Sequence, residues 1–230
     1  MSVSDEVLRI DDEAVVWSVA REERSERLAE EPLVIVMHGR GSHENDLAEL
    51  FPRLPAGMVY ASLRAPLSGA PWGLGGWTWF PSPASSSSGA GPLADDVEAA
   101  VAAVLAWVDR VEAAYGAPTA IVGLGFSQGG MMTIELMRAR PGRFRAGVDL
   151  SGVSASRSVP GHETLATDRP PLFWGCDDLD PIISAAASSR AREFLPAHFT
   201  LTSRRYPGIG HSISLDELTD VSAFLDETAR

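Results

Sequence analysis

Apolar runs alternate with segments of helical periodicity along most of the chain. A near-continuous apolar run at Leu33–Met37 predicts a buried parallel strand, and Met58–Leu63 predicts a second one. Two shorter apolar segments, Val7–Ile10 and Ala14–Val19, flank three acidic residues and predict an opening hairpin. Further strands are predicted at Thr119–Leu124, Arg145–Leu150, Leu172–Trp174 and Thr200–Tyr206. The alternation predicts an α/β fold, with a mostly parallel sheet between two layers of helices.

The clearest helical pattern begins at Pro92 and ends before Gly116, which suits a left-handed cap. Its apolar stripe has steps of three and four and consists of Leu93, Val97, Val101, Val104, Val108, Val111 and Tyr115. Two more helices are predicted at Gly130–Arg138, ahead of Pro141, and at Ala185–Phe194. A last helix begins at Ser214, which forms a predicted capping box with Glu217.

Composition narrows the class of protein. A chain of 230 residues suits a single domain over residues 1–230 and buries about 70% of its unfolded surface, so it needs no metal or disulfide staple. Nineteen basic and 31 acidic residues give a net charge of −12, which argues against nucleic acid or an anionic membrane as a partner. The one cysteine excludes an internal disulfide and fits a reducing compartment.

The N-terminal segment is acidic and lacks the basic start and apolar run of a signal peptide. The longest clearly apolar run, Leu33–Met37, is too short to span a bilayer. We therefore expect a cytoplasmic protein without stable membrane insertion, as a monomer or a homodimer.

A long segment between Arg64 and Gly91 is rich in Pro, Gly and Ser and has no clear periodicity. Loops of this length in compact domains are usually functional or mobile. Its first part carries four aromatic residues that we expect to form the wall of a substrate site, unless they only pack against the sheet: Trp72, Trp77, Trp79 and Phe80.

A nucleophile motif lies between a predicted strand and a predicted helix. The sequence Gly-Phe-Ser-Gln-Gly at residues 125–129 has the G-x-S-x-G pattern in the context that this motif requires. Glycine at 125 and 129 removes the side chains that would crowd a tight turn at Ser127. The helix that follows directs free N–H groups at a developing oxyanion.

The predicted partners of this serine come from distant segments. After the first buried strand, His38-Gly39-Arg40-Gly41 allows close backbone approach, so we expect the N–H groups of Arg40 and Gln128 to bind an oxyanion. His38 itself is expected to be a structural hydrogen-bonding residue. Among five histidines, His211 lies between the last strand and the last helix, at the sheet edge where ligands bind in open α/β folds. We therefore expect His211 to be the general base.

These motifs resemble the α/β-hydrolase fold and, within it, the phospholipase/carboxylesterase family that includes acyl-protein thioesterases. The matching stretches are MHGRGSHENDL, LRAP with GGWTWF, GFSQGG, LSG, DPII and YPGIGHSIS. The resemblance implies no large cap domain, a catalytic triad in the order Ser127, Asp180, His211, and no cofactor or metal. Asp177 and Asp178 are alternatives for the acid, and Asp149 is a more distant one.

The acidic stretch FWGCDDLDPII at residues 173–183 has two other interpretations. A hard cation needs several oxygen ligands, but Pro181 and apolar residues stand where further ligands would be required. Cys176 has no basic residue near it in sequence to activate it as a nucleophile. We therefore expect one working carboxylate here, Asp180, with Asp177 and Asp178 solvated.

The predicted function is that of a serine carboxylesterase acting on short- to medium-chain acyl esters or thioesters through an acyl-enzyme. Only about twenty residues, 153–170, join the predicted strands Arg145–Leu150 and Leu172–Trp174. This connection is too short for a helical cap domain, so the site should be open. The alternatives are a lysophospholipase, an acyl-protein thioesterase, a lactonase or a peptidase with the same triad. A further alternative is a catalytically silent binding module of this fold.

Overall fold

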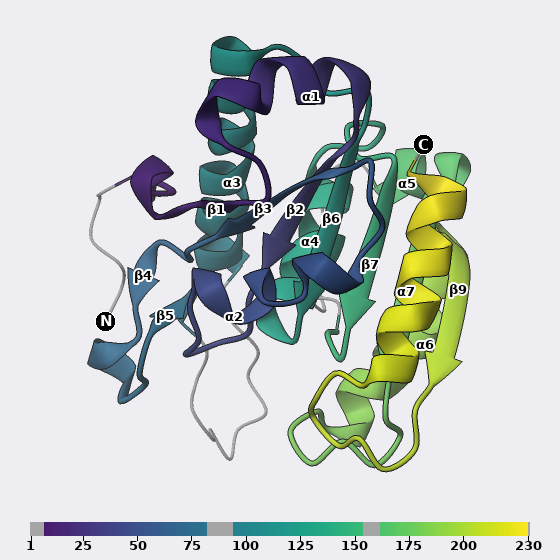
Figure 1. The fold of residues 1–230 in the computed structure, drawn as a ribbon. Helices are drawn as coiled ribbons and strands as arrows, with labels where there is room; N and C mark the ends of the chain where they lie inside the picture. The colour runs from purple at the N-terminus through teal and green to yellow at the C-terminus, as the bar shows by residue number, and fades with distance from the viewer. Residues whose placement is uncertain (1–6, 82–93, 154–161, 230) are drawn as a thin grey trace.

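The computed structural model describes residues 7–81, 94–153 and 162–229. One central sheet has seven strands in the order β1-β3-β2-β6-β7-β8-β9, and only β1 runs antiparallel to its neighbour (Figure 1). The strands are β1 (Val16–Trp17), β2 (Leu33–Met37), β3 (Val59–Leu63), β6 (Ile121–Phe126), β7 (Ala146–Leu150), β8 (Pro171–Cys176) and β9 (Thr200–Arg205). This architecture confirms the predicted α/β class and the mostly parallel sheet.

The order of the strands reverses at the centre of the sheet. Strand β2 has β3 on one side and β6 on the other, and Met37 pairs with Gly125. The loop after β2 and the turn after β6 therefore leave the same edge of the sheet side by side. This is the switch point at which open α/β folds bind ligands.

Helices cover both faces of the sheet. They are α1 (Arg24–Glu30), α2 (Glu44–Ala48), α3 (Ala94–Tyr115), α4 (Gln128–Ala139), α5 (His162–Asp168), α6 (Ala185–His198) and α7 (Leu215–Thr228). Figure 1 shows α2 and α7 in front of the sheet and α3 and α4 behind it, and a separate hydrophobic core fills the space on each side. No helix in the described part of the chain has both the length and the apolarity needed to cross a membrane.

Helix α3 follows the predicted apolar stripe. Val97, Val101, Val104, Val108 and Val111 are all buried, because residues three and four apart lie on one face. Gly116 follows the helix with φ of +92°, as predicted for a left-handed cap. The predicted start at Pro92 and Leu93 lies outside the described residues.

The predicted opening hairpin is wrong. The Asp11 side chain accepts a hydrogen bond from the Glu13 N–H at 3.1 Å and caps a short 3-10 helix, Asp12–Ala14, so the acidic residues begin a helical turn. Val16 and Trp17 then pair with β3 at the edge of the main sheet. Side-chain capping at Asp11 competes with a hairpin turn at this point.

The predicted capping box of α7 forms only in part. Ser214 Oγ accepts a hydrogen bond from the Glu217 N–H at 3.1 Å, which is the expected N-cap. The Glu217 carboxyl does not return to the backbone of Ser214. Instead it is fully buried against Gly175, and neither of its oxygens has a hydrogen-bond partner among the described residues.

The aromatic part of the segment after β3 is more ordered than predicted. Strands β4 (Leu67–Ser68) and β5 (Trp77–Thr78) pair as a small antiparallel ribbon. This ribbon is joined to the loop after β2, because the Gly41 N–H donates to the Trp77 carbonyl and the Trp77 N–H donates to the Ser42 carbonyl, each at 2.8 Å. The Ser/Gly tract that follows lies outside the described residues.

Candidate active site

Ser127 lies on a sharp turn between β6 and α4, in a strained backbone conformation with φ of +56° and ψ of −113°. A Cβ on Gly125 would overlap the backbone of Gly129, and a Cβ on Gly129 would overlap the Met37 carbonyl group. The Ser127 N–H donates to the Leu150 carbonyl at 2.8 Å, which holds the turn against β7. The two glycines therefore allow the backbone packing that brings the serine hydroxyl out at the sheet edge.

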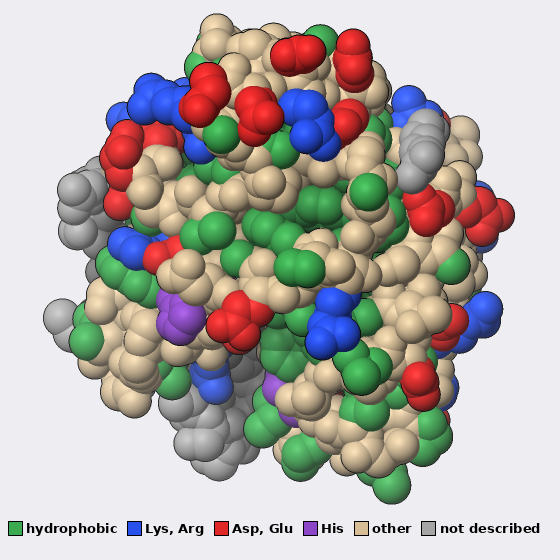
Figure 2. Space-filling view, in the orientation of Figure 1, with side chains coloured by type: hydrophobic (Ala, Val, Ile, Leu, Met, Phe, Trp, Pro, Cys, Tyr) green, Lys and Arg blue, Asp and Glu red, His purple; other side chains and the backbone are tan. Residues whose placement is uncertain are grey.

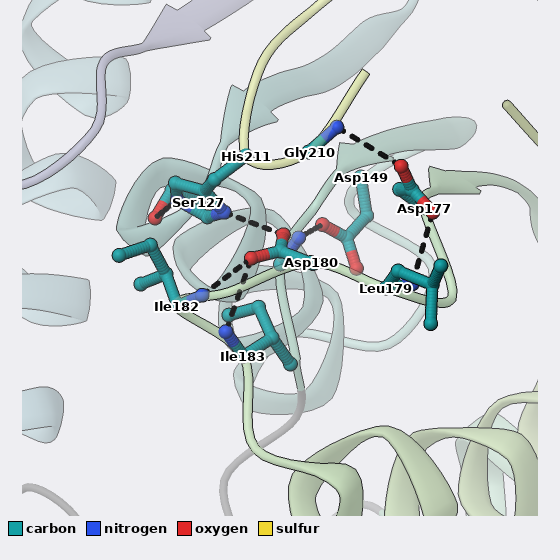
Figure 3. Close-up of polar contacts among 10 residues, drawn as sticks. Ser127, Asp149, Asp177, Leu179, Asp180, Ile182, Ile183, Gly210 and His211 are labelled. Atoms are coloured by element: carbon teal, nitrogen blue, oxygen red, sulfur yellow. Dashed lines mark hydrogen bonds and ion pairs between the residues drawn. The ribbon is translucent and has the colours of Figure 1, made fainter. Parts of the chain in front are cut away.

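Two further predicted side chains meet this serine (Figure 3). His211 Nε2 lies 2.8 Å from Ser127 Oγ, and His211 Nδ1 lies 2.6 Å from Asp180 Oδ2. The other oxygen, Asp180 Oδ1, accepts hydrogen bonds from the N–H groups of Ile182 at 2.8 Å and Ile183 at 3.1 Å. A proton on Nδ1 satisfies Asp180 and leaves Nε2 free to accept the serine proton.

Of the two acidic neighbours of Asp180, Asp178 is exposed as predicted, whereas the expectation that Asp177 is solvated is wrong. Asp177 is buried, with Oδ1 accepting from the Leu179 N–H at 2.9 Å and Oδ2 accepting from Gly210 at 2.9 Å and Gly208 at 2.8 Å. These bonds, that from Leu179 first, lower the pKa of Asp177. Asp177 therefore ties the loop that carries His211 to the loop that carries Asp180.

Asp178 forms ion pairs with Arg192 at 2.7 Å and Arg205 at 2.9 Å. Its side chain is about half exposed, so these pairs contribute little to stability. Of the three aspartates, only Asp180 contacts His211.

The loop after β2 is held by a neutral histidine. His38 is fully buried, its Nδ1 lies 2.7 Å from the Gly39 carbonyl, and its Nε2 accepts from the Ala65 N–H at 3.1 Å. Burial lowers the pKa of His38. One ring nitrogen therefore donates and the other accepts, which agrees with the structural role predicted for this residue.

The predicted oxyanion donors lie beside the serine. A Cβ built on Gly39 would be 3.6 Å from the Ser127 Cβ, so the backbone that leads to Arg40 adjoins Ser127. Gln128 is the first residue of α4, where N–H groups have no acceptor within the helix. The positions of both backbone segments beside Ser127 are compatible with the predicted role of these N–H groups as oxyanion donors, which stays a prediction.

The Gln128 side chain has a second role, which we did not predict from the sequence. Its Oε1 accepts from Thr78 Oγ1 and from the Trp79 N–H, each at 3.0 Å, and its Nε2 donates to the Phe80 carbonyl at 2.9 Å. These bonds fasten the aromatic segment to the first turn of α4. No local sequence signal marks this contact, because the partners are about fifty positions apart.

The prediction that these aromatic residues form the wall of the substrate site is only partly correct. Trp79 is fully buried and donates from Nε1 to the His38 carbonyl at 2.8 Å, so it supports the loop after β2 from within. Trp77 packs against the Arg64 guanidinium, which is paired with Glu44. Phe80 faces the cavity, whereas the Trp72 side chain lies outside the described residues.

A cavity of about 530 Å³ opens at Ser127 and His211. Its apolar lining consists of Phe80, Phe126, Met131, Val153, Ile182 and Ile183. Its polar lining consists of Arg40, Ser42, Asp46 and Gln128. Ile182 and Ile183 were not singled out from the sequence, although they directly follow Asp180-Pro181.

Another cavity, of about 640 Å³, is lined by Trp17, Arg24 and Tyr115 beside α3. It contains neither a serine nor a histidine, so the smaller cavity is the better candidate for chemistry. On the face shown in Figure 2, acidic and basic side chains are interspersed.

Two other candidates in the sequence, Cys176 and Asp149, lie in buried surroundings. Burial raises the pKa of Cys176 to about 11, so its thiol stays protonated near neutral pH. Asp149 is fully buried and makes no hydrogen bond to His211; it accepts one from the Gly152 N–H. Within the described ranges, no three His, Cys, Asp or Glu side chains form a group that could hold a metal ion.

A mostly parallel sheet with a serine on a strained turn after one strand and a histidine after the last strand defines an α/β-hydrolase. The sequence profile of the Phospholipase/Carboxylesterase family matches residues 21–229. The chain therefore belongs to the phospholipase/carboxylesterase family, as its motifs predicted.

Curated relatives carry names of two kinds. A probable carboxylesterase of Oryza sativa subsp. japonica is 30% identical over 151 residues, which are 64% of this chain and 57% of that protein. A probable carboxylesterase of Arabidopsis thaliana is 28% identical over 77% of this chain and 66% of its own length, so both plant alignments span less than two thirds of the relative. Acyl-protein thioesterase 1 of Kluyveromyces lactis is 26% identical over 215 residues, 86% of this chain and 92% of that protein.

Solved structures share the fold at lower identity. The Bacillus cereus carboxylesterase superposes with a TM-score of 0.75 at 19% identity, covering 93% of each chain. The esterase PE8 has a TM-score of 0.71 at 24% identity and covers 96% of this chain and 99% of its own. At such identities the likeness establishes the α/β-hydrolase fold.

Proposed function

We propose that the protein is a serine carboxylesterase that hydrolyses short- to medium-chain acyl esters or thioesters through an acyl-enzyme. The observation that carries this proposal is the continuous hydrogen-bonded chain from Asp180 through His211 to Ser127, at 2.6 Å and 2.8 Å. Its order along the sequence, Ser, Asp, His, is the order of this fold.

In the proposed first step, His211 Nε2 takes the proton of Ser127 Oγ as that oxygen attacks the acyl carbonyl carbon. Asp180 holds the imidazole with its proton on Nδ1 and stabilises the imidazolium that forms. The negative charge on the carbonyl oxygen is bound by the N–H groups of Arg40 and Gln128. One such donor is typically worth about 3–4 kcal/mol of transition-state stabilisation.

The tetrahedral intermediate then collapses when His211 gives its proton to the leaving alcohol or thiol. A water molecule, deprotonated by His211, attacks the acyl-enzyme, and His211 then returns this proton to Ser127 Oγ as the bond to the acyl carbon breaks and the carboxylic acid is released. All protons are carried by His211 in both halves of the reaction, and the proposal needs no cofactor or metal.

The cavity supports an acyl substrate of limited size. Phe80, Met131 and Val153 lie on its apolar side, where an acyl chain would be desolvated. Relatives named carboxylesterase and acyl-protein thioesterase support oxygen and sulfur esters as the proposed substrate classes. Lysophospholipids and lactones are alternatives on the same triad.

A fluorophosphonate probe tests the proposed nucleophile. We expect the wild type and an exposed-serine control, Ser203→Ala, to be labelled with one probe per chain, while Ser127→Ala is not labelled. Mass spectrometry of the labelled peptide checks the position. Labelling of Ser127→Ala, or none of the wild type, would reject the serine mechanism and favour the binding-module alternative.

A series of p-nitrophenyl esters from acetate to palmitate, with matched thioesters, tests the substrate class. We expect kcat/KM to be highest for short and medium chains, because the apolar lining of the cavity is limited. A maximum at palmitate would contradict this and favour a lysophospholipase or acyl-protein thioesterase. Single-domain organisation and cytoplasmic location stay predictions from the sequence.

A further inference from the structure

Asp149, at the end of β7, is a buried carboxyl group that the proposed reaction does not use. Its side chain is fully buried, and Oδ1 accepts a hydrogen bond from the Gly152 N–H at 2.8 Å. Oδ2 has no hydrogen-bond partner among the described residues. A buried polar atom without a partner costs stability, so its presence at this position calls for a reason.

Two glycines leave the space that this carboxyl group occupies. A Cβ on either Gly130 or Gly152 would collide with Asp149 Oδ1. Gly130 lies in the first turn of α4, three residues after Ser127, and Gly152 ends the turn that follows β7. The carboxyl group therefore fills the contact between these two turns, and Figure 3 shows its hydrogen bond to the turn after β7.

The turn after β7 supports the serine directly. The Ser127 N–H donates to the Leu150 carbonyl at 2.8 Å, and a Cβ on Gly152 would lie 2.9 Å from the Ser127 carbonyl oxygen. Ser151, between them, has φ of +54°, a conformation that a non-glycine residue adopts only when its surroundings impose it. The hydrogen bond from Gly152 to Asp149 closes this turn.

We propose that Asp149 is a positioning residue for the proposed esterase reaction: its carboxyl group locks the turn of residues 149–152 under Ser127 and so fixes the direction of the serine hydroxyl. This inference rests on the proposed function. Asp149 acts through the backbone of Ser127 and Gly152 and does not touch the substrate.

The charge state of Asp149 matters for this role. Burial raises the pKa of Asp149 to about 8, the Gly152 N–H opposes this, and Glu217 adds to it. The titratable groups facing it are Cys176 on β8 and Glu217 on α7, while the first turn of α4, residues 128–131, has none. The group is therefore an uncharged acid at neutral pH.

Ionisation of Asp149 would weaken catalysis. A carboxylate at this place would bring a negative charge close to the positive end of α4, where the proposed oxyanion must be stabilised. The proton is lost as the pH rises through the raised pKa, so this effect sets in on the alkaline side. We expect the wild type to lose kcat above about pH 8.

Three variants test the role, with activity expressed per site titrated by a fluorophosphonate. Asp149→Asn keeps the oxygen that accepts from Gly152 and cannot ionise. We expect it to retain kcat within about threefold at pH 7 and to lack the alkaline decline. Asp149→Ala removes the acceptor, and we expect at least about a tenfold loss of kcat with KM changed by less than about threefold.

Glu217→Gln is the matched control, because it also neutralises a buried acid but does not contact the serine turn. We expect it to keep an alkaline decline, shifted to lower pH because Glu217 no longer adds to the pKa of Asp149. A wild-type kcat per titrated site in Asp149→Ala, or an alkaline decline that persists in Asp149→Asn, would overturn the proposal. If Asp149→Ala does not fold, the pH profile of Asp149→Asn decides alone.

The two proposals fail in different ways. Absence of labelling at Ser127 in the wild type overturns the proposed function, and the role of Asp149 with it. Labelling of Ser127 together with unchanged kinetics in the Asp149 variants overturns only the positioning role.

Discussion

At the scale of single residues, the acidic stretch around Asp180 shows how neighbouring carboxylates acquire different roles. Asp180 faces His211, Asp177 is buried among backbone N–H groups, and Asp178 pairs with two arginines. Side chains of adjacent residues in a loop can have entirely different surroundings, so residues that are close in sequence need not share a role. The three residues are therefore separable by mutation.

Asp180→Asn should lower kcat by about 10³–10⁴, because an amide favours the wrong imidazole tautomer. Asp178→Asn should change kcat by less than about twofold, because exposed ion pairs contribute little. Asp177→Asn should give an intermediate loss, because it loosens the contact with Gly208 and Gly210. Hydrolysis of p-nitrophenyl butyrate per titrated site measures the ranking, and a larger effect at Asp177 than at Asp180 would move the proposed acid.

The burial of Glu217 leads to a prediction of how the stability of the fold depends on pH. Burial raises its pKa from 4.5 to about 7, so the folded state binds more protons than the unfolded state between these values. Its contribution to stability is therefore full at low pH and is lost as the pH rises from about 4.5 to about 7. Glu217→Gln should raise the free energy of unfolding at pH 8 by at most about 3 kcal/mol relative to the wild type, and much less at pH 5, with the Tm changing in the same sense.

Thermal unfolding followed by circular dichroism at the two pH values checks this expectation. Glu227→Gln is the control, since Glu227 is exposed on the same helix, α7. An equal shift of the Tm at both pH values would show that the substitution acts through packing and not through ionisation.

At the scale of elements, the junction between β6 and α4 depends on close backbone packing. Gly129→Ala should abolish esterase activity and destabilise the fold by several kcal/mol, on the order of an overpacked core position, because its Cβ would overlap the Met37 carbonyl. Gly75→Ala is the control, because a Cβ at Gly75 meets nothing within 4 Å. Urea unfolding and titrated activity distinguish the two, and a folded, active Gly129→Ala would contradict the packing described for this turn.

The attachment of the aromatic segment to α4 can be tested through Gln128. Gln128→Met keeps the volume and the backbone N–H but leaves the buried Trp79 N–H without its acceptor, which should cost about 1–3 kcal/mol. Because Phe80 lines the cavity, KM should rise more than kcat falls. Thr78→Val removes only one hydrogen bond to Gln128 and should have a smaller effect. Steady-state kinetics of Gln128→Met that show only a loss of kcat would contradict a role of Gln128 in shaping the cavity.

At the scale of the whole molecule, a single sheet continues from β1 to β9, with a hydrophobic core on each of its faces. We therefore expect one cooperative unfolding transition, with calorimetric and van't Hoff enthalpies that agree. A covalent fluorophosphonate adduct at Ser127 should raise the Tm without splitting the transition, if the adduct adds contacts in the folded state alone. Two separate calorimetric peaks would contradict the single domain.

The sequence by itself determined the fold class and the candidate nucleophile and base. Strand and helix periods are local, so the apolar runs from Leu33 onward and the stripe of α3 could be predicted directly. The turn at Ser127 and the loop at His211 also carry local signals, since glycine is needed where backbones meet or turn sharply. The prediction of an opening hairpin was wrong because helix capping by the Asp11 side chain is also a local interaction and competes with a hairpin turn.

Only the tertiary structure decided which groups these residues meet. Asp180 contacts His211, Gln128 fastens the aromatic segment, and Trp79 turns into the interior rather than toward a substrate. Asp149 and Glu217 became buried acids for the same reason. Each of these roles depends on contacts between segments far apart in sequence, and such contacts are set by how strands and helices pack, which no local period of the chain encodes.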